Sequence, residues 1–298
     1  MQINRRDGLL AAATMTMASV APAIGQDRTQ TVIDAIGRHV RVPDPVERIV
    51  IASHYAYEDF TAIAGAEGWS KVVGIAREPW VDWRAATYAE YAKVIPNLDS
   101  LPDVGTLGPE FDADKVIALK PDVVLLEALQ DSLIGDQLRA LRVADIAVIY
   151  IDLQAETLFR RSMSIAAIGL VTGAQARAGE LFRFYTQLHN DVLDRLPTTE
   201  PYTQSVYAEV AETATEIIGW TDSVRLWGGM AINLYALNIA HNHVPEYGGQ
   251  LPADVLLAIH GKAALSRRIC RHRPRKRAGR FSRALPARAV QRHLVCSP

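Results

Sequence analysis

The stretch from Leu101 to Glu127 constrains the fold more than any other part of the chain. Asp112 is placed to start a helix, since acidic residues favour the positive end of the helix dipole. Pro121 ends that helix, because proline disfavours helical geometry at the residue before it. The apolar run Val123–Leu126 then predicts a strand covered on both faces. Glu127 follows at the carboxyl end of this strand, where open α/β sheets bind ligands.

The rest of the first 155 residues alternates strands with helices. Residues Thr31–Val42 alternate in polarity about Gly37, which predicts a β-hairpin. Apolar runs predict strands at 48–52, 72–75 and 147–151, and helices are expected at 59–66, 130–141 and 155–171. Strands that alternate with helices in this way are typical of a parallel α/β sheet.

A long amphipathic helix is predicted from Ala174 to Leu196. Its apolar residues recur at alternating steps of four and three, which places them on one face of the helix. They are Ala174, Ala178, Leu181, Tyr185, Leu188, Val192 and Leu196. A helix of this length spans roughly 34 Å, enough to bridge two lobes.

A second α/β unit follows the break at Pro197–Pro201. Ser205–Val210 is predicted to be its first strand, and Ile217–Gly219 is a candidate for a short second one. Further on, Pro252–Ile259 (PADVLLAI) is similar to Asp112–Leu119 (DADKVIAL) in the first unit. The two units are therefore expected to share an element.

Several segments resemble the periplasmic binding proteins that take up metal chelates. The sequence PDVG is followed by DADKVIALKPDVVLL, and the hairpin carries Asp-x-x-Gly-Arg. Leu226–Asn233 resembles the family's Gly-Gly-x-Asn region with altered spacing. The family is the group whose lobes are joined by a single helix, and it delivers siderophores, haem, cobalamin or metal ions to ABC importers. The resemblance covers residues 31–260 and says little about which ligand is bound.

The resemblance implies an α/β fold of two Rossmann-like lobes joined by one long α-helix. The N-terminal lobe would occupy residues 30–155, and a helical segment would follow at 156–197 with the hinge helix at 174–196. The C-terminal lobe would occupy residues 202–260 and be incomplete. In the family, the single helix limits closure of the lobes to small motions.

Residues 1–26 are predicted to be an export signal. Arg5-Arg6 precede an apolar run from Leu9 to Val20, and Ala21-Pro22-Ala23 offers small residues for cleavage. The run is too short for a stable membrane anchor. The paired arginines resemble a twin-arginine signal, although the general secretory route stays open. We therefore expect a periplasmic protein.

The sequence pattern breaks abruptly after His260. Residues 261–298 contain 12 Lys and Arg and no Asp or Glu, so the preceding residues hold 20 basic and 33 acidic side chains. We infer a shift of reading frame near this point, which would truncate the second lobe and leave residues 261–298 disordered. The alternative is a genuine basic tail that binds phosphate or lipid.

The remaining composition bounds the function. The acidic body suits a solute-binding protein and argues against nucleic acid as a partner. Both cysteines, Cys270 and Cys296, lie in the basic segment, so the body has neither a disulfide nor a cysteine metal site. The motifs of serine hydrolases, P-loop proteins and H-E-x-x-H metalloproteases are missing from the sequence. We expect a binding protein, not an enzyme, without a cofactor of its own.

Ligand contacts are expected in loops that follow strands, where the lobes face each other. Rings supply apolar contact, arginine pairs with anionic groups, and His and Tyr are suitable ligands for ferric iron. The rings between Arg77 and Tyr91 form either a cleft wall or the ordinary packing of a loop. The first-lobe candidates are His54, Tyr55, Tyr57, Trp80, Trp83, Arg84 and Glu127. The second-lobe candidates are Glu209, Glu212, Trp220, Trp227, His241, His243 and Tyr247.

Asp114 and Asp254 occupy matching places in the two units. In the family, acidic residues here, usually Glu, dock each lobe onto arginines of the inner-membrane permease; alternatively, both simply favour the start of a helix. The resemblance thus implies a monomer that captures a metal chelate, first of all a ferric siderophore, for an ABC permease. Haem, cobalamin, a bare metal ion, or a decayed copy without a transport role are the alternatives.

Overall fold

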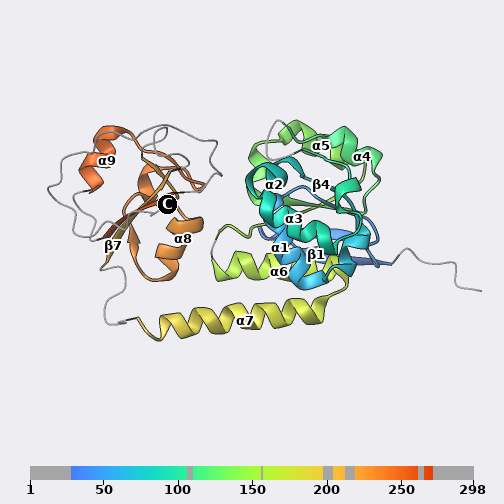
Figure 1. Ribbon diagram of the computed structural model, residues 1–298, viewed down its shortest axis with the longest axis horizontal. Helices are drawn as coiled ribbons and strands as arrows, with labels where there is room; N and C mark the ends of the chain where they lie inside the picture. Colours follow the sequence, from blue (N-terminus) through green and yellow to red (C-terminus); the bar gives the residue numbers. More distant parts are fainter. Residues whose placement is uncertain are drawn as a thin grey trace, which may run out of the picture.

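The computed structural model describes residues 28–105, 110–155, 157–196, 204–211, 219–260 and 265–270. They form two α/β lobes, and one long helix runs along one side of the molecule (Figure 1). The predicted export signal, Glu212, Ile217 and most of the basic segment lie outside the described residues. Within those residues, no helix is long and apolar enough to cross a membrane.

The first lobe is built on a four-stranded parallel sheet, as the alternation of strands and helices predicts. The strand order is β4-β3-β5-β6. Every residue of β5 is buried, because helices cover both faces of this central strand. The strands are β3 (Ile49–Ile51), β4 (Val72–Ile75), β5 (Val123–Glu127) and β6 (Ala147–Ile151).

The hairpin about Gly37 is confirmed as β1 (Thr29–Ile33) and β2 (His39–Pro43), paired antiparallel. The first-lobe helices are η1 (His54–Ala56), α1 (Tyr57–Ala64), η2 (Glu67–Lys71), α2 (Glu78–Trp83), α3 (Ala85–Val94), η3 (Leu98–Ser100), α4 (Ala113–Ala118), η4 (Ala128–Ser132) and α5 (Gly135–Val143).

Two first-lobe expectations are corrected. The helix expected at 130–141 is divided into η4 and α5, because a 3-10 turn follows β5 first, with the Gln130 side chain accepting from the Glu127 amide at 2.8 Å. The ring-rich stretch from Arg77 to Tyr91 is mostly helical, in α2 and α3, and is not a loop. Pro79 suits the first turn of α2.

Helices α6 (Leu158–Thr172) and α7 (Gln175–Leu193) follow the sheet and pack against each other. They approach closely at Gly169, where an added Cβ would lie 2.5 Å from the Cβ of Ala178. On α7, Ala178 is buried, whereas Leu188 and Val192 near its other end are exposed. The helix is four residues shorter than predicted, and its role as a hinge stays a prediction.

The second lobe has a mixed sheet in the order β10-β8-β7-β11, with β9 also paired to β7. The strands are β7 (Ser205–Ala211), β8 (Trp220–Thr221), β9 (Leu237–Asn238), β10 (Gly249–Gln250) and β11 (Leu265–Cys270). The helices are α8 (Leu226–Asn233), η5 (His241–His243) and α9 (Ala253–His260).

The expectation of a disordered C-terminal segment is wrong for residues 265–270. This part forms β11, which pairs in parallel with β7 along six residue pairs. The pairing joins backbone groups, so it does not require the apolar run that usually signals a strand. The order α9–β11 also repeats α4–β5 of the first lobe, where β5 pairs in parallel with the lobe's first core strand. The frameshift itself stays a hypothesis that resequencing would decide.

Candidate functional site

The two lobes meet at the carboxyl ends of β5 and β6. These ends place Glu127 and Asp152 side by side at the edge of the first-lobe sheet, both fully buried. Arg225, immediately before α8 in the second lobe, reaches them with one nitrogen: its Nη2 lies 2.8 Å from Glu127 Oε1 and 3.0 Å from Asp152 Oδ1. Only 2% of Arg225 is exposed. An arginine of one lobe is thus inserted between two carboxyls of the other.

Further polar contacts surround this arginine. Its Nη2 also donates to the side-chain oxygen of Gln154 at 3.2 Å, and its guanidinium lies 4.4 Å from the centre of the Tyr247 ring. The next residue, Leu226, donates its backbone N–H to the Gln154 carbonyl across the lobes at 2.8 Å. At the rim, Arg160 Nη1 bridges Asp152 at 2.9 Å and Glu246 at 3.0 Å.

The electrostatics of the site follow from two buried carboxyls that share one guanidinium nitrogen. Burial raises the pKa of Glu127 to about 8; the charge of Asp152 adds to the rise, while Arg225 opposes it. This environment favours a proton on Glu127 near neutral pH. The Ser53 hydroxyl lies 3.4 Å from its other oxygen, Oε2.

One guanidinium nitrogen of Arg225, Nη1, is buried and makes no hydrogen bond with the described residues. A buried donor without an acceptor costs free energy, so an acceptor on a bound ligand would be favoured there. The arrangement suits a ligand that carries a carboxylate, phenolate or other anionic oxygen.

Two of the predicted ligand contacts lie at the interface between the lobes. Glu127 and Tyr247 belong to the interface around Arg225. His54 is 2% exposed and lies between two rings, 3.9 Å from the centre of Tyr55 and 5.4 Å from that of Trp83. Trp83 itself is half-exposed, and Arg84 forms an ion pair with Glu58.

The structure corrects the prediction for Tyr57 and Trp80. Both are fully buried in the first-lobe core, with their rings stacked at 4.0 Å. Tyr57 donates its hydroxyl to the Ala76 carbonyl at 2.6 Å, and Trp80 also packs against Trp69. For Trp80, the alternative of ordinary packing is therefore the right one.

The second-lobe candidates are more scattered. Trp220 and Trp227 are partly exposed, on β8 and α8, and Glu209 lies on β7. The residues from His241 to His243 form the 3-10 helix η5, so the histidines do not alternate along a strand. Nδ1 of His241 contacts the Ser223 hydroxyl at 3.0 Å. No group of three or more His, Cys, Asp or Glu side chains that could hold a metal ion occurs in the described part of the chain.

Sequence reasoning missed Arg225, Asp152 and Arg160 as site residues. Asp152 had a usable signal, because it follows strand β6 as Glu127 ends β5. Arg225 had none, since a single arginine before an apolar helix looks like a surface residue. Its role depends on a contact with a residue 98 positions away.

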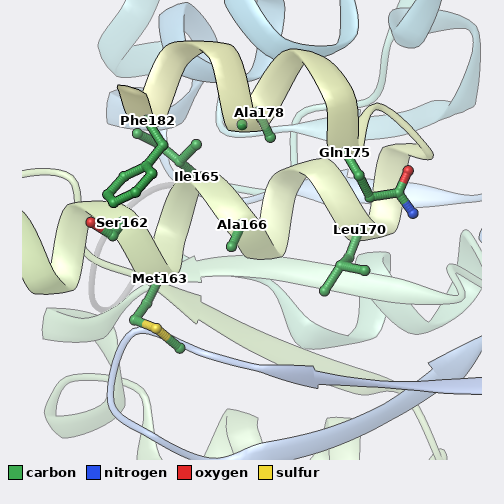
Figure 2. Close-up of a pocket in the computed structure, with 9 residues that line it drawn as sticks. Ser162, Met163, Ile165, Ala166, Leu170, Gln175, Ala178 and Phe182 are labelled. Carbon is green, nitrogen blue, oxygen red and sulfur yellow. The ribbon is translucent and has the colours of Figure 1, made fainter. Parts of the chain in front are cut away.

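A separate groove lies between α6 and α7, with a volume of about 350 Å³ (Figure 2). Met163, Ile165, Leu170 and Phe182 are the large apolar side chains of its lining, and none of its residues is charged. Its lining includes no cationic side chain for an anionic ligand and does not include Arg225.

The expected docking residues are both exposed. Asp114 is in the first turn of α4, and Asp254 is in the first turn of α9. The two helices belong to different lobes and lie on the side of the molecule away from α7 (Figure 1).

No family model and no curated protein matches the chain. Among solved structures, it is similar to the TroA-like periplasmic binding protein FepB from Veillonella parvula, with 27% identity over 80% of this chain and 69% of that one and a TM-score of 0.62. The molybdate-binding protein MolA of Haemophilus influenzae is 17% identical over 80% and 73%, with a TM-score of 0.56. A periplasmic heme binding protein from Pseudomonas aeruginosa is 19% identical over 76% and 72%, with a TM-score of 0.50.

These neighbours confirm the resemblance that the sequence predicts. The chain has the two-lobe α/β fold of TroA-like periplasmic binding proteins. The likeness supports a periplasmic solute-binding protein. The named cargoes of the neighbours differ, so the cargo of this chain has to be argued from its own site.

Proposed function

We propose that this protein binds a ferric siderophore between its lobes and delivers it to an ABC permease. The observation that carries the proposal is the buried Arg225, whose Nη1 has no acceptor among the described residues. Many ferric siderophores are anionic chelates with carboxylate or phenolate oxygens. Such an oxygen would complete the hydrogen bonding of the guanidinium in a site from which water is largely excluded.

Rings near the interface supply the second requirement of a bulky chelate. Tyr247 lies against Arg225, and Tyr55 and Trp83 flank His54 in the first lobe. Flat apolar surfaces of this kind contact the aromatic or aliphatic body of a chelate while the arginine binds its charge. Haem would satisfy the same two requirements, whereas cobalamin or a bare metal ion would use fewer of these groups.

Delivery to the permease would depend on the side of the molecule that carries α4 and α9. Asp114 and Asp254 stand exposed, one on each lobe, and α4 and α9 lie on the same side of the molecule (Figure 1). Carboxylates placed in this way would guide both lobes onto basic residues of a permease. The protein supplies no bond chemistry in this scheme; it captures, encloses and docks.

The proposal is tested by titrating the protein with ferric siderophores, haemin, cobalamin and zinc while following tryptophan fluorescence. Trp83 and Trp227 are the reporters, because both are partly exposed, and Trp227 lies two residues from Arg225. We expect saturable quenching by a ferric siderophore at micromolar or tighter affinity. Saturation by haemin, cobalamin or zinc alone would identify that molecule as the cargo instead of a siderophore. No response to any of the four would refute the proposed binding function.

Two variants sharpen this titration. Arg225→Gln should weaken binding at least tenfold, whereas Arg139→Gln, which removes only an exposed ion pair with Asp136, should leave it unchanged. Equal affinity in both variants would place the cargo elsewhere. In a strain that lacks the gene, a chain carrying Asp114→Lys and Asp254→Lys should bind the siderophore normally and fail to support growth on it. Normal growth would refute the docking role.

A further inference from the structure

The polar contacts between the lobes gather at one place in the described part of the chain. Arg225 reaches Glu127, Asp152 and Gln154, and Arg160 reaches Glu246 close by. The backbone N–H of Leu226 adds a hydrogen bond to the Gln154 carbonyl at 2.8 Å. This cluster is therefore what closing the lobes forms and what opening them breaks.

The charges of the cluster do not balance when every group is ionised. Its inner part consists of Glu127, Asp152 and Arg225, all at least 98% buried, so two carboxylates face one guanidinium. At the rim, Arg160 Nη1 pairs with Asp152 at 2.9 Å and with the half-exposed Glu246 at 3.0 Å, so the five groups together still hold three carboxyls against two guanidinium groups. A net buried charge is costly, and the simplest remedy is one proton on one carboxyl.

We propose that Glu127, Asp152 and Arg225 form a proton-linked latch: the lobes take up a proton when they close, and a rise in pH favours their opening. In the open state Glu127 would face water and ionise as an ordinary carboxyl does, at about pH 4.3. In the closed state its pKa is raised to about 8, first by burial and also by the charge of Asp152. This inference concerns the empty protein and does not depend on which cargo it binds.

Apart from Asp152 and Arg225, the groups in contact with Glu127 are neutral and do not account for a proton taken up on closing. The Ser53 hydroxyl and the Gln130 amide side chain contact it and are neutral at ordinary pH. His54 is the next residue after Ser53. The Tyr247 ring lies against Arg225, and burial raises the pKa of its hydroxyl, so Tyr247 stays neutral. Asp152 and Arg225 are the charged partners, with Arg160 and Glu246 behind Asp152.

The backbone beside Arg225 is strained in a way that fits a latch. Leu226 has φ of 44°, in the left-handed region that a residue with a Cβ rarely adopts. This conformation occurs at the residue whose N–H crosses to the first lobe. Strain of this kind is retained where surrounding contacts hold it, and opening the lobes would release it.

Hydrogen exchange of the Leu226 amide measures the latch directly, because that N–H is bonded across the lobes. Its protection factor in the ligand-free full chain should fall about tenfold per pH unit between pH 6 and 8, as one proton is lost on opening. The Ala52 amide, bonded to the Leu125 carbonyl inside the first-lobe sheet, is the internal control and should not follow this trend.

Three variants separate the latch from general destabilisation. Glu127→Gln keeps an oxygen for Arg225 and cannot ionise, so Leu226 should stay protected at every pH. Asp152→Asn leaves Arg225 to one carboxylate, so the pH dependence should shrink. Glu246→Gln, at the exposed rim, should keep the wild-type slope.

Two results would overturn the latch. One is a Leu226 amide that lacks protection at every pH, which would mean that the contact does not form in solution. The other is a Glu127→Gln chain with the wild-type slope, since the proton would then belong to another group. Circular dichroism of each variant, recorded alongside, shows that a changed slope does not come from an unfolded lobe.

Discussion

Two tryptophans three positions apart show how far single residues can be predicted from the sequence. Trp80 and Trp83 have the same chemistry and the same ring-rich surroundings, so sequence reasoning treats them alike. The structure buries Trp80 completely against Tyr57, Tyr88 and Tyr91, and leaves Trp83 half-exposed at the end of α2. The difference depends on how α2 packs on the lobe, which the local sequence does not encode.

This difference predicts opposite effects of the same substitution. Trp80→Ala should lower the free energy of unfolding by about 3–5 kcal/mol, because it leaves a large cavity in the core. Trp83→Ala should lower it by less than about 1 kcal/mol, since the ring is half in water. Urea unfolding followed by circular dichroism measures both, without relying on tryptophan emission. Similar losses in the two variants would contradict the placement of Trp80 in the core.

The site residues also differ in whether the local sequence predicts their position. Glu127 and Asp152 follow apolar strands, a local signal that predicts their place at the edge of the sheet. Arg225 and Arg160 have no such signal, because their importance comes from contacts made only after the lobes have folded and met. The acidic half of the cluster was therefore accessible from sequence, and the basic half was not.

At the level of elements, prediction succeeded where one period dominates a segment. The hairpin, the strands β3 to β6 and the helices α4, α6 and α7 all carry clear patterns of alternating or helical apolar spacing. It failed for the short helix α2 and for η5, which are too short for a period to emerge. Prediction also failed for β11, because this strand pairs with β7 through its backbone and contains no apolar run that would indicate a strand.

Two glycines in α6 and α7 offer a matched test of how these helices pack. Gly169→Ala should destabilise the protein by about 1–3 kcal/mol, because the new methyl group would lie 2.5 Å from the Cβ of Ala178 and force the helices apart. Gly179→Ala meets only the end of the Arg183 side chain at 3.5 Å. It should stabilise by about 0.5–1 kcal/mol through helix propensity.

Thermal and urea unfolding of the two single variants measure this contrast in sign. A destabilising Gly179→Ala would mean that α7 is not helical or not open at that position. A neutral Gly169→Ala would mean that α6 and α7 are not in close contact. Either result would also remove the basis for the groove between them.

For the whole molecule, the sequence predicted two lobes through resemblance, and the structure adds how they are joined. The first lobe has a complete parallel sheet, whereas the second has short strands and depends on β7 as its centre. The last strand, β11, comes from the segment for which a frameshift is inferred. Whether or not the segment is native in origin, β11 pairs in parallel with β7 in the second lobe, just as β5 pairs in parallel with β3 in the first lobe.

This role predicts how the second lobe responds to truncation. A chain that ends at His260 loses the partner of β7 along six residue pairs, and its second lobe should be less stable by a few kcal/mol, at about 1 kcal/mol for each hydrogen bond lost. A chain that ends at Cys270 keeps β11 and is the matched control. Because the first-lobe sheet does not contact β11, its unfolding transition should be unchanged in both chains.

Hydrogen exchange of the β7 amides, read against those of β5, distinguishes the possible outcomes. Loss of protection in β7 only in the shorter chain establishes that β11 supports the lobe and hence the position of Arg225 opposite Glu127. Equal protection in both chains would mean that the pairing contributes nothing. The second lobe would then be held by β8, β9 and its contacts with the first lobe, and the end of the chain could be altered without weakening the latch.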